Sequence, residues 1–483
     1  MKRFAALAAL LATACSTMEP TYVRPEPAVP ASWPVGDPYL AQAEAGLPVL
    51  TYQQVFQDQR LQRLITLALA NNRDLLTAAA NIAAAREQYR IQRAQQLPVV
   101  NATAGATVAG NAKGNVGAQY NLGASVPSFE LDLFGRVRSL SHAELARFLA
   151  TEAGARETRL TLVAQLAGAW LDYAADSSLR LIAEQTAKAA QRSVELTRLR
   201  LEGGIAPRTD LEEAIQTLSI AQADVARQRT LVAQDLNALQ LLVGAPIDPA
   251  LLSGSIDDAF GKIVPVPAGL DSYVLLRRPD VLQAEYQLRA ANAQIGAARA
   301  ALFPRISLTG LLGFASTALT KLFTAGAFGL SAGADVTYTI FQGGAGRANV
   351  RLTEAQRNAA VASYQGTIQT AFREVSDALA RRGTINEEIG ARERQQAATA
   401  TTYRLTEARY RAGIDPYLNV LSAQQSYYNA QQTMVQVKLT AAQNLVTIYQ
   451  TIGGDALLQG TPVCATLPGD KSAAPTSTFC KTS

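Results

Sequence analysis

The chain has 483 residues, more than one compact domain usually contains, so two or three domains or one elongated body are expected. Hydrophobic residues make up 48%, but only 6% are aromatic and 17% charged. This alanine-rich composition suits closely spaced helices packed through small side chains better than one thick core. The net charge of +5 is modest, and basic residues alternate with acidic ones, as in Arg392-Glu393-Arg394. The composition therefore excludes a nucleic-acid-binding surface.

Residues 1–14 have the character of a signal peptide. Lys2 and Arg3 form a short basic region, and the apolar stretch that follows, up to Ala14, is too short to span a bilayer. Small residues precede Cys15 in Leu11-Ala12-Thr13-Ala14-Cys15, and this resembles a bacterial lipoprotein signal in which the cysteine is lipidated. The leucine lies one position further from Cys15 than is usual. An ordinary secretory signal that happens to contain a cysteine is therefore the alternative.

Residues 15–50 are rich in proline. Proline has no amide donor and disfavours helix in the residue before it. The segment is therefore predicted to be an extended, lipid-anchored tether between the membrane and a helix-rich body.

Two more cysteines, Cys464 and Cys480, lie in the C-terminal tail, residues 457–483. With Cys15 acylated, they form an even pair in an oxidising compartment, which favours a disulfide that closes a short loop. Two free thiols in the tail are the alternative.

Between residues 51 and 456 the chain repeats itself once. Asn71-Asn72-Arg73-Asp74 aligns with Arg277-Arg278-Pro279-Asp280, and Gly204-Ile205-Ala206-Pro207 aligns with Gly413-Ile414-Asp415-Pro416. A spacing of about 200 residues is typical of a duplicated half-molecule and not of a solenoid repeat. Two halves, residues 51–250 and 251–456, should therefore share one order of elements.

Each half contains two segments in which apolar residues alternate with polar or small ones, which predicts four strands in two hairpins. The expected strands cover about 98–110 and 115–130 in the first half, and 304–316 and 328–341 in the second. Strands of about ten residues with one apolar face have the length and pattern of membrane-crossing strands. A soluble β-sandwich would show the same alternation, but four strands separated by long helices have no second sheet to pack against.

Long helices are predicted after each strand hairpin, over about 136–202 and 345–411, because apolar residues recur at intervals of three and four. Glycine-containing turns at residues 203–204 and 413 then reverse the chain into second helices over about 208–243 and 416–452. Each long helix would extend about 100 Å, with a coiled-coil-like seam. The fold class is therefore mainly α, with two long helical hairpins and four membrane strands.

Four membrane strands cannot close into a barrel, because an open edge in lipid leaves unpaired amides that each cost several kcal/mol. The subunit must therefore oligomerise: a dimer gives eight strands and a trimer twelve. Because the helices continue from the strands, a closed ring of strands implies a ring of helices. A hollow helical cylinder attached to a membrane barrel is a conduit.

Several segments together resemble the TolC-type outer-membrane efflux proteins, in particular their lipoprotein (NodT-type) branch. They are Cys15 with Tyr22-Val23-Arg24-Pro25, Phe129-Glu130-Leu131-Asp132-Leu133-Phe134-Gly135-Arg136, Arg277-Arg278-Pro279-Asp280, Phe303-Pro304 and Arg409-Tyr410-Arg411-Ala412-Gly413.

The resemblance implies a homotrimer with a twelve-stranded barrel in outer-membrane lipid and a periplasmic α-barrel tunnel. It also implies two partners: a periplasmic adaptor (membrane fusion) protein, and an inner-membrane pump of the resistance-nodulation-division type. The chain itself would be a passive duct for small molecules such as drugs.

By the same resemblance, Asp415 matches an acidic position that rings the closed periplasmic aperture. Three symmetry-related carboxylates would favour cations and make closure sensitive to pH and ions. A role as helix N-cap is the alternative, because Asp415 precedes Pro416, which suits the first helical position, and the two roles are compatible. Arg411, Asp210 and Arg208 are further candidates, for contacts between neighbouring hairpins.

Three other functions are alternatives to the duct. An enzyme is disfavoured, because His142 is the sole histidine and no catalytic, cofactor-binding or metal-ligating constellation accompanies it; the doublet Asp257-Asp258 is expected in a loop, as turn chemistry. A periplasmic coiled-coil scaffold without a pore would explain the helices and the lipid anchor, but not four strands. The exit duct of a protein secretion system is the third alternative.

Overall fold

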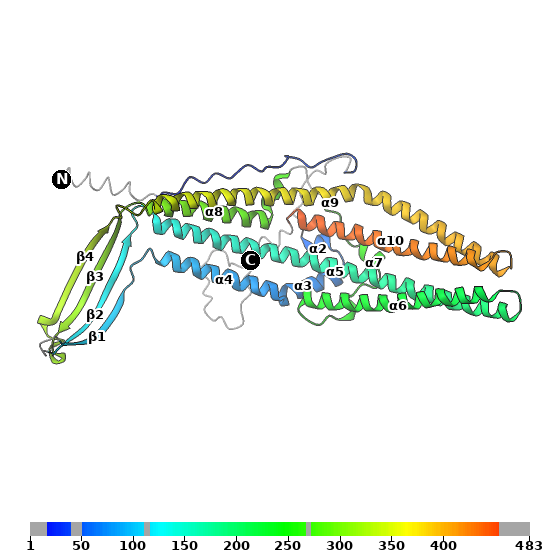
Figure 1. Cartoon of the computed structure of the whole chain (residues 1–483), viewed down its shortest axis with the longest axis horizontal. Coiled ribbons are helices and arrows are strands. Elements are labelled where there is room, and N and C mark those ends of the chain that lie inside the picture. Colours follow the sequence, from blue (N-terminus) through cyan, green and yellow to red (C-terminus); the bar gives the residue numbers. More distant parts are fainter. Residues whose placement is uncertain (1–16, 40–50, 111–115, 267–271, 454–483) are drawn as a thin grey trace. The chain divides into compact units, whose positions relative to one another are not determined.

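The computed structural model describes residues 17–39, 51–110, 116–266 and 272–453 (Figure 1). Cys15, Cys464 and Cys480 lie outside the described residues, so the lipidation and the disulfide remain predictions.

The chain forms two compact units. We call the first the sheet unit; it consists of Met1–Pro27, Asn81–Ala153 and Leu282–Gly366. We call the second the hairpin unit; it consists of Ala28–Ala80, Gly154–Val281 and Thr367–Ser483. Each unit takes segments from both sequence halves, so the compact units do not coincide with the halves 51–250 and 251–456.

The main elements occur twice in the same order, a helix, two strands, a long helix and a second helix. The first set is α4 (Arg73–Ala94), β1 (Asn101–Gly110), β2 (Val116–Leu131), α5 (Arg136–Glu202) and α6 (Arg208–Val243). The second set is α8 (Pro279–Ala300), β3 (Arg305–Ser316), β4 (Phe328–Thr337), α9 (Ala345–Arg411) and α10 (Tyr417–Thr451). Helices α4 and α8 have 22 residues each, and α5 and α9 have 67 each. The predicted duplication is confirmed.

Shorter elements lie before, between and within these sets. They are α2 (Tyr52–Val55), α3 (Gln59–Asn71), α7 (Ile256–Phe260) and the 3-10 turns Pro249–Leu251, Ser272–Arg277, Leu319–Lys321 and Ala325–Ala327. Across the described ranges, no helix combines the length and the apolar character needed to cross a membrane.

In the sheet unit, the four strands form one antiparallel sheet in the order β1-β2-β3-β4 (Figure 1). Directly paired residues share a face, so the register defines one continuous apolar face and one polar face. Ala102 pairs with Ala124, Ala124 with Leu312, and Leu312 with Leu330. Every residue of β1 and β4 is exposed, so no described element covers these two strands.

A β-bulge in β2 keeps the two faces consistent. Val126 pairs with Gly310, but Phe129 pairs with Leu308, so β2 contains one extra residue at this point. The shift brings Phe129 and Leu131 onto the apolar face after the alternation of the sequence changes phase. Pro127 lies within the bulge, where a missing amide interrupts no ladder hydrogen bond.

Strands β1 and β4 are shorter than predicted at their helix-proximal ends. Strand β4 ends at Thr337 and not near residue 341, and β1 begins at Asn101 and not near residue 98. Thr337 pairs with Arg305, the first residue of β3. Pro304 precedes Arg305 and has no amide to continue the ladder, so β4 has no partner beyond this point.

The segment predicted as a tether is packed against helices. In the sheet unit, Tyr22 and Arg24 donate hydrogen bonds to Glu285 of α8, at 3.3 and 2.7 Å. The Glu285 side chain is only 3% exposed, so it needs these partners and Arg289, which lies 2.6 Å away. In the hairpin unit, Trp33 is buried and stacks on Phe372 at 5.2 Å. The prolines of the N-terminal segment prevent it from forming a helix, but its polar and aromatic side chains bind it to the helices.

The core of the hairpin unit lies among α3, α5, α6, α7 and α10. Trp170 of α5 is fully buried, and its indole Nε1 donates a hydrogen bond to the carbonyl of Leu251 at 3.1 Å. Phe56 and Tyr449 meet edge to face with ring centroids 5.2 Å apart. Most other core residues are Ala, Leu, Ile and Val, which agrees with the predicted packing through small side chains.

Arg278, in the motif Arg277-Arg278-Pro279-Asp280, is buried and ties three helices of the hairpin unit together. Its guanidinium donates to the Thr451 carbonyl at the end of α10 at 2.8 Å and to Glu374 of α9 at 2.9 Å. It also pairs with Asp280, in the first turn of α8, at 2.7 Å. A buried cation requires such full pairing, which explains this part of the motif.

The prediction that Asp257 and Asp258 lie in a loop is wrong. Both lie in the first turn of α7, where the Ser255 side chain accepts a hydrogen bond from the Asp257 amide. Acidic residues there interact favourably with the helix dipole. Asp257 also pairs with Lys438, and Asp258 with Lys262.

Three carboxyl groups meet between α5 and α6 in the hairpin unit. Asp172 of α5 accepts a hydrogen bond from Gln443 at 2.7 Å. Asp176, one turn further along α5, interacts with Asp235 of α6, and two neighbouring carboxyl groups favour a proton shared between them. Burial and the neighbouring negative charge of Asp176 raise the pKa of Asp235 to about 7. Arg227 is the cation that acts on Asp176.

Stability should therefore decrease as pH rises from about 4 to about 7. Below pH 4 the carboxyl is protonated in both folded and unfolded chains, whereas near pH 7 the folded chain loses a proton that the unfolded chain has already released. The side chain of Asp235→Asn does not titrate, so the variant should not lose stability as pH rises. It should melt about 2–4 °C higher than the unchanged chain at pH 8, and its melting temperature should depend less on pH. Thermal unfolding in detergent at several pH values measures this.

Asp257→Asn is the matched control, because Asp257 lies in the same unit but pairs with Lys438 and not with the three carboxyl groups. It should lower the melting temperature without flattening the profile. Equal pH slopes in Asp235→Asn and the unchanged chain would contradict the shared proton.

Candidate functional site: the turns of the helical hairpins

Both helical hairpins reverse through the same turn. In the first, the amide of Ile205 donates to the carbonyl of Arg200 at 2.9 Å, and that of Gly204 to Leu201 at 3.0 Å. In the second, Ile414 donates to Arg409 and Gly413 to Tyr410, both at 2.9 Å. These are Schellman caps, which need a residue with positive φ.

Glycine supplies that backbone conformation at both turns. Gly204 has φ +72° and Gly413 has φ +75°. The turns leave Ile205 and Ile414, at equivalent positions, 71% and 62% exposed. A proline follows each turn as the N-cap of the next helix, at Pro207 and Pro416.

Asp415 is held by Arg409 across the second turn. The guanidinium contacts both carboxylate oxygens, Nε to Oδ2 at 2.7 Å and Nη2 to Oδ1 at 3.0 Å. The hydrogen bonds from Arg409 hold the pKa of the Asp415 carboxyl below its usual range. Asp415 therefore stays ionised through neutral pH, and its charge is compensated within the same chain.

The alternative role of Asp415 as helix N-cap is wrong. Pro416 occupies the N-cap of α10 with an extended backbone, φ −71° and ψ 156°, and α10 begins at Tyr417. Asp415 lies one residue earlier, and its carboxylate is engaged by Arg409.

The other predicted residues pair locally. Arg411 contacts Glu407 at 2.6 Å and Arg208 contacts Glu212 at 3.2 Å, each one turn away on its own helix. Asp210 lies in the first turn of α6, where a carboxylate favours the helix N-terminus. The described chain gives none of these three a contact with the other hairpin.

The two hairpins are joined near their turns by residues that the sequence reasoning did not select. Arg200 of α5 donates to the Tyr410 carbonyl of α9 at 2.8 Å, and its guanidinium lies 4.4 Å from the centre of the Tyr410 ring. Tyr410 in turn packs against Tyr417, with ring centroids 5.4 Å apart. Burial raises the pKa of Tyr417 to about 12, so its hydroxyl stays protonated.

Arg409 and Tyr410 stood in the motif that carried the family resemblance, but their roles were missed. The spacing offered a signal for Arg409: it precedes Asp415 by six residues, and a Schellman turn between them brings such residues together. Arg200 gave no comparable signal, because its partner is 210 residues away in sequence.

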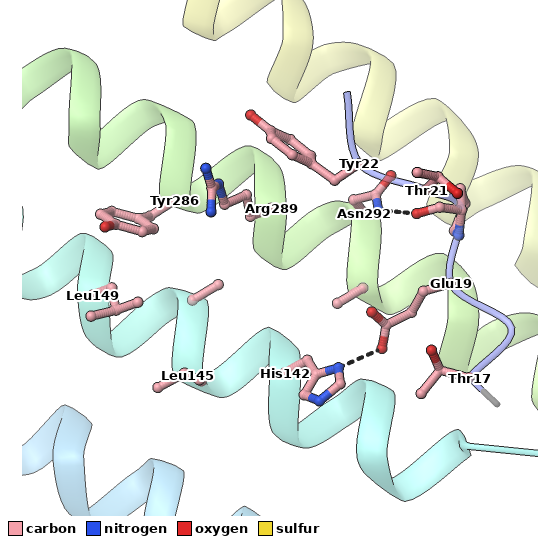
Figure 2. A pocket seen from close by; sticks show the side chains of 13 residues that line it. Thr17, Glu19, Thr21, Tyr22, His142, Leu145, Leu149, Tyr286, Arg289 and Asn292 are labelled. Atoms are coloured by element: carbon pink, nitrogen blue, oxygen red, sulfur yellow. Dashed lines mark hydrogen bonds and ion pairs between the residues drawn. The ribbon is translucent and has the colours of Figure 1, made fainter. Parts of the chain in front are cut away.

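A cavity of about 420 Å³ in the sheet unit contains His142 (Figure 2). Its walls come from α5, α8 and residues 17–22 of the N-terminal segment. His142 Nδ1 lies 2.9 Å from Glu19 Oε1, and Asn292 donates to the Pro20 carbonyl at 2.8 Å. These contacts fix the N-terminal segment and bring no nucleophile to His142. Nor do the described residues hold a group of three His, Cys, Asp or Glu side chains suited to a metal ion.

Comparison with known proteins identifies relatives over most of the chain. The protein family described as "Outer membrane efflux protein" matches residues 64–245 and 271–454. The antibiotic efflux pump outer membrane protein ArpC of Pseudomonas putida is 40% identical over 463 residues, covering 93% of this chain and 94% of ArpC. The cation efflux system protein CusC of Escherichia coli is 35% identical over 452 residues, covering 92% and 97%.

Among solved structures, the open state of the MtrE outer membrane channel of Neisseria gonorrhoeae matches with a TM-score of 0.83 and 33% identity. The match covers 91% of this chain and 98% of the MtrE chain.

Proposed function

This chain belongs to the outer membrane efflux protein family, and we propose that three copies of it form the passive exit duct of a tripartite efflux pump. Like its relatives, it is the outer-membrane channel component of an efflux system. The observation that supports a trimer is the four-stranded sheet, whose outer strands are exposed along their whole length. Three copies supply twelve strands, enough for a closed barrel in outer-membrane lipid.

The long helices support the periplasmic part of the proposal. Helices α5 and α9 each contain 67 residues, about 100 Å at 1.5 Å per residue. Three copies of the two hairpins would form an α-barrel tunnel. A periplasmic adaptor protein and an inner-membrane pump of the resistance-nodulation-division type would complete the assembly and drive transport.

Small molecules are the proposed cargo. The names of two relatives refer to antibiotic and cation efflux, and neither refers to protein secretion. Family membership favours a duct over a catalyst, and the one histidine is engaged with Glu19.

Lipidation of Cys15 is proposed as the membrane anchor. Thr17 lies against Gly135, directly after β2, so closely that a side chain on Gly135 would come within 2.7 Å of the Thr17 Cα. Two residues of chain span at most about 7 Å. An acyl group on Cys15 would thus enter the membrane next to the strands.

If the chain forms a duct, the purified protein should conduct ions across a bilayer in discrete current steps. Detergent-purified protein should have the mass of a trimer and insert into planar bilayers with uniform current steps. A folded monomer that never conducts would exclude the duct and favour a coiled-coil scaffold. Blockade by a polypeptide, with no effect of small-molecule cargo, would favour the protein secretion alternative.

Extraction behaviour tests the anchor separately. Cys15→Ala should lose the mass of the acyl group but still require detergent for release from outer membranes, because the strands hold it there. Mass spectrometry and carbonate washes check this. Release of the variant by carbonate would contradict membrane-spanning strands, and an unmodified Cys15 in the unchanged protein would contradict lipidation.

We also propose that Asp415, with Arg409, lines the periplasmic aperture. Asp415→Ala should raise the conductance of the closed channel, because the ion pair that fixes the turn to α9 is lost, and should reduce cation preference. Arg409→Ala breaks the same pair but leaves the carboxylate, so conductance should rise while cation preference increases.

Arg180→Ala serves as control, since Arg180 pairs with Glu184 on its own helix, α5, well before the first turn. It should leave both properties unchanged. If neither Asp415→Ala nor Arg409→Ala alters the current, the aperture assignment fails.

A further inference from the structure

We propose that the cavity beside His142 binds the phosphoethanolamine headgroup of a phospholipid from the periplasmic leaflet of the outer membrane. Arg289 binds the phosphate and Glu19 binds the ammonium. The inference rests on the proposed function, because that function places the strands in the membrane, and it adds a ligand that passive transport does not itself require.

The cavity lies close to the strands within the sheet unit. Helix α5 begins at Arg136, shortly after β2 ends, and His142 follows about 9 Å further along the helix. Thr17, which also lines the cavity, lies against Gly135. Phospholipid headgroups occupy about 5–7 Å beyond the hydrocarbon on each side of a bilayer. With the strands across the hydrocarbon, the Thr17 end of the cavity is at the depth of the headgroups.

One end of the cavity carries a net positive charge. Arg289 donates to Glu285 through Nε and Nη2, at 3.1 and 2.6 Å, and Arg24 donates to the same carboxylate at 2.7 Å. Two guanidinium groups share one carboxylate, so these three groups together remain cationic. The bonds from Arg289 to Glu285 do not use Nη1, which can donate a charge-assisted hydrogen bond to a phosphate oxygen.

Two tyrosine rings hold the guanidinium of Arg289 at this end. Its Cζ lies 4.7 Å from the centre of the Tyr22 ring and 5.6 Å from the centre of the Tyr286 ring. A guanidinium that is already held by two rings and by Glu285 loses little conformational freedom when it binds an anion. The cationic end is therefore preorganised for a phosphate.

The other end of the cavity carries a carboxylate. Figure 2 shows Glu19 and His142 across the cavity from Arg289 and Tyr286. Glu19 Oε1 lies 2.9 Å from His142 Nδ1, and His142 is charged only if it is protonated. A side chain on Gly296 would come within 2.5 Å of the Glu19 Cγ, so the glycine allows Glu19 to approach α8 this closely. Glu19 Oε2 can accept a hydrogen bond from an ammonium.

A cation at one end and an anion at the other favour a zwitterion. An anionic headgroup would be repelled by Glu19, and a cationic molecule would be repelled by Arg289. Leu145, Leu149 and Ala293 also line the cavity, and the glycerol part of a lipid can pack against them. The volume of about 420 Å³ suits a small polar group. It is too small for two acyl chains, which would remain in the membrane.

Native mass spectrometry of the full, detergent-purified chain tests the site. The probes are phosphatidylethanolamine, phosphatidylglycerol, which has the phosphate but no ammonium, and free O-phosphoethanolamine, which has no acyl chains. The unchanged protein should bind phosphatidylethanolamine about tenfold more tightly than phosphatidylglycerol, because the contact with Glu19 joins two charged groups. The free headgroup should bind more weakly than the lipid.

Three substitutions separate the parts of the site. Glu19→Gln should abolish the preference for phosphatidylethanolamine, and Arg289→Gln should weaken both lipids about tenfold. Leu145→Trp fills the cavity and should weaken both lipids with no change of charge. Glu87→Gln and Arg90→Gln are the matched controls, because these residues form an exposed ion pair on α4 in the same unit. Both controls should bind the lipids as the unchanged protein does.

Arg289→Lys distinguishes lost phosphate binding from a disturbed N-terminal segment, because Arg289 also pairs with the buried Glu285. This variant keeps the positive charge, so it should bind both lipids more tightly than Arg289→Gln does. Equal weakening in Arg289→Lys and Arg289→Gln would contradict an electrostatic role for Arg289.

The outcomes separate the lipid site from the duct. Loss of the preference in Glu19→Gln, with both controls unchanged, supports the site. A preference that survives both Glu19→Gln and Leu145→Trp, or its absence in the unchanged protein, overturns the site. Free phosphoethanolamine that binds as tightly as the lipid overturns the membrane as its source. Conducting trimers without the preference leave the proposed function intact, whereas monomers that show the preference but never conduct overturn the function and not the site.

Discussion

The backbone hydrogen bonds that β1 and β4 leave open at the sheet edges are the constraint on which this architecture depends. A soluble protein can leave such groups to water, but a membrane-crossing sheet cannot. The alternation of apolar and small residues, the bulge at Pro127 and the equal lengths of β1 and β4 fit the proposed ring, in which another copy continues the sheet at each edge. In the proposed ring, the helices that precede and follow each strand hairpin form a cylinder as a result of the same closure.

The long helices are stabilised differently, because they extend far without a thick hydrophobic core. Alanine-rich packing lets them approach closely, and the larger side chains gather around Trp170 in the hairpin unit. The reversals rest on two glycines with positive φ, followed by prolines that start the next helices. Both halves use the same turn, so the two hairpins have the same backbone conformation at their ends. Near these turns, Arg200 donates a hydrogen bond to the Tyr410 carbonyl and joins the two hairpins.

Buried charges fix how segments distant in sequence meet. Glu285 fixes the N-terminal segment to α8 in the sheet unit, and Arg278 fixes the end of α10 to α9 in the hairpin unit. Each such group would be strongly destabilising if unpaired, so each specifies one arrangement. The described part of the N-terminal segment is therefore held against helices in each unit, and its contact with Gly135 supports the proposed anchor.

The sequence alone determined the elements whose signal is local. The alternation of apolar residues predicted the four strands. Their recurrence at intervals of three and four, with glycine and proline at the turns, predicted the bounds of α5 and α9. The internal repeat predicted the order of these elements. The family resemblance then followed from several short motifs. These features need only the neighbouring residues to be recognised.

Tertiary structure decided what depends on distant partners. The C-terminal end of β4 was set by Pro304, which precedes the adjacent strand β3. The loop expected at Asp257 is a helix with Lys438 as partner, and the expected tether is docked through Glu285. Asp415 was a predicted site residue, but its pairing with Arg409 depends on the three-dimensional course of the turn. Hydrogen bonds and ion pairs act across a few ångströms of space whatever the sequence separation, so only the folded chain shows which residues they join.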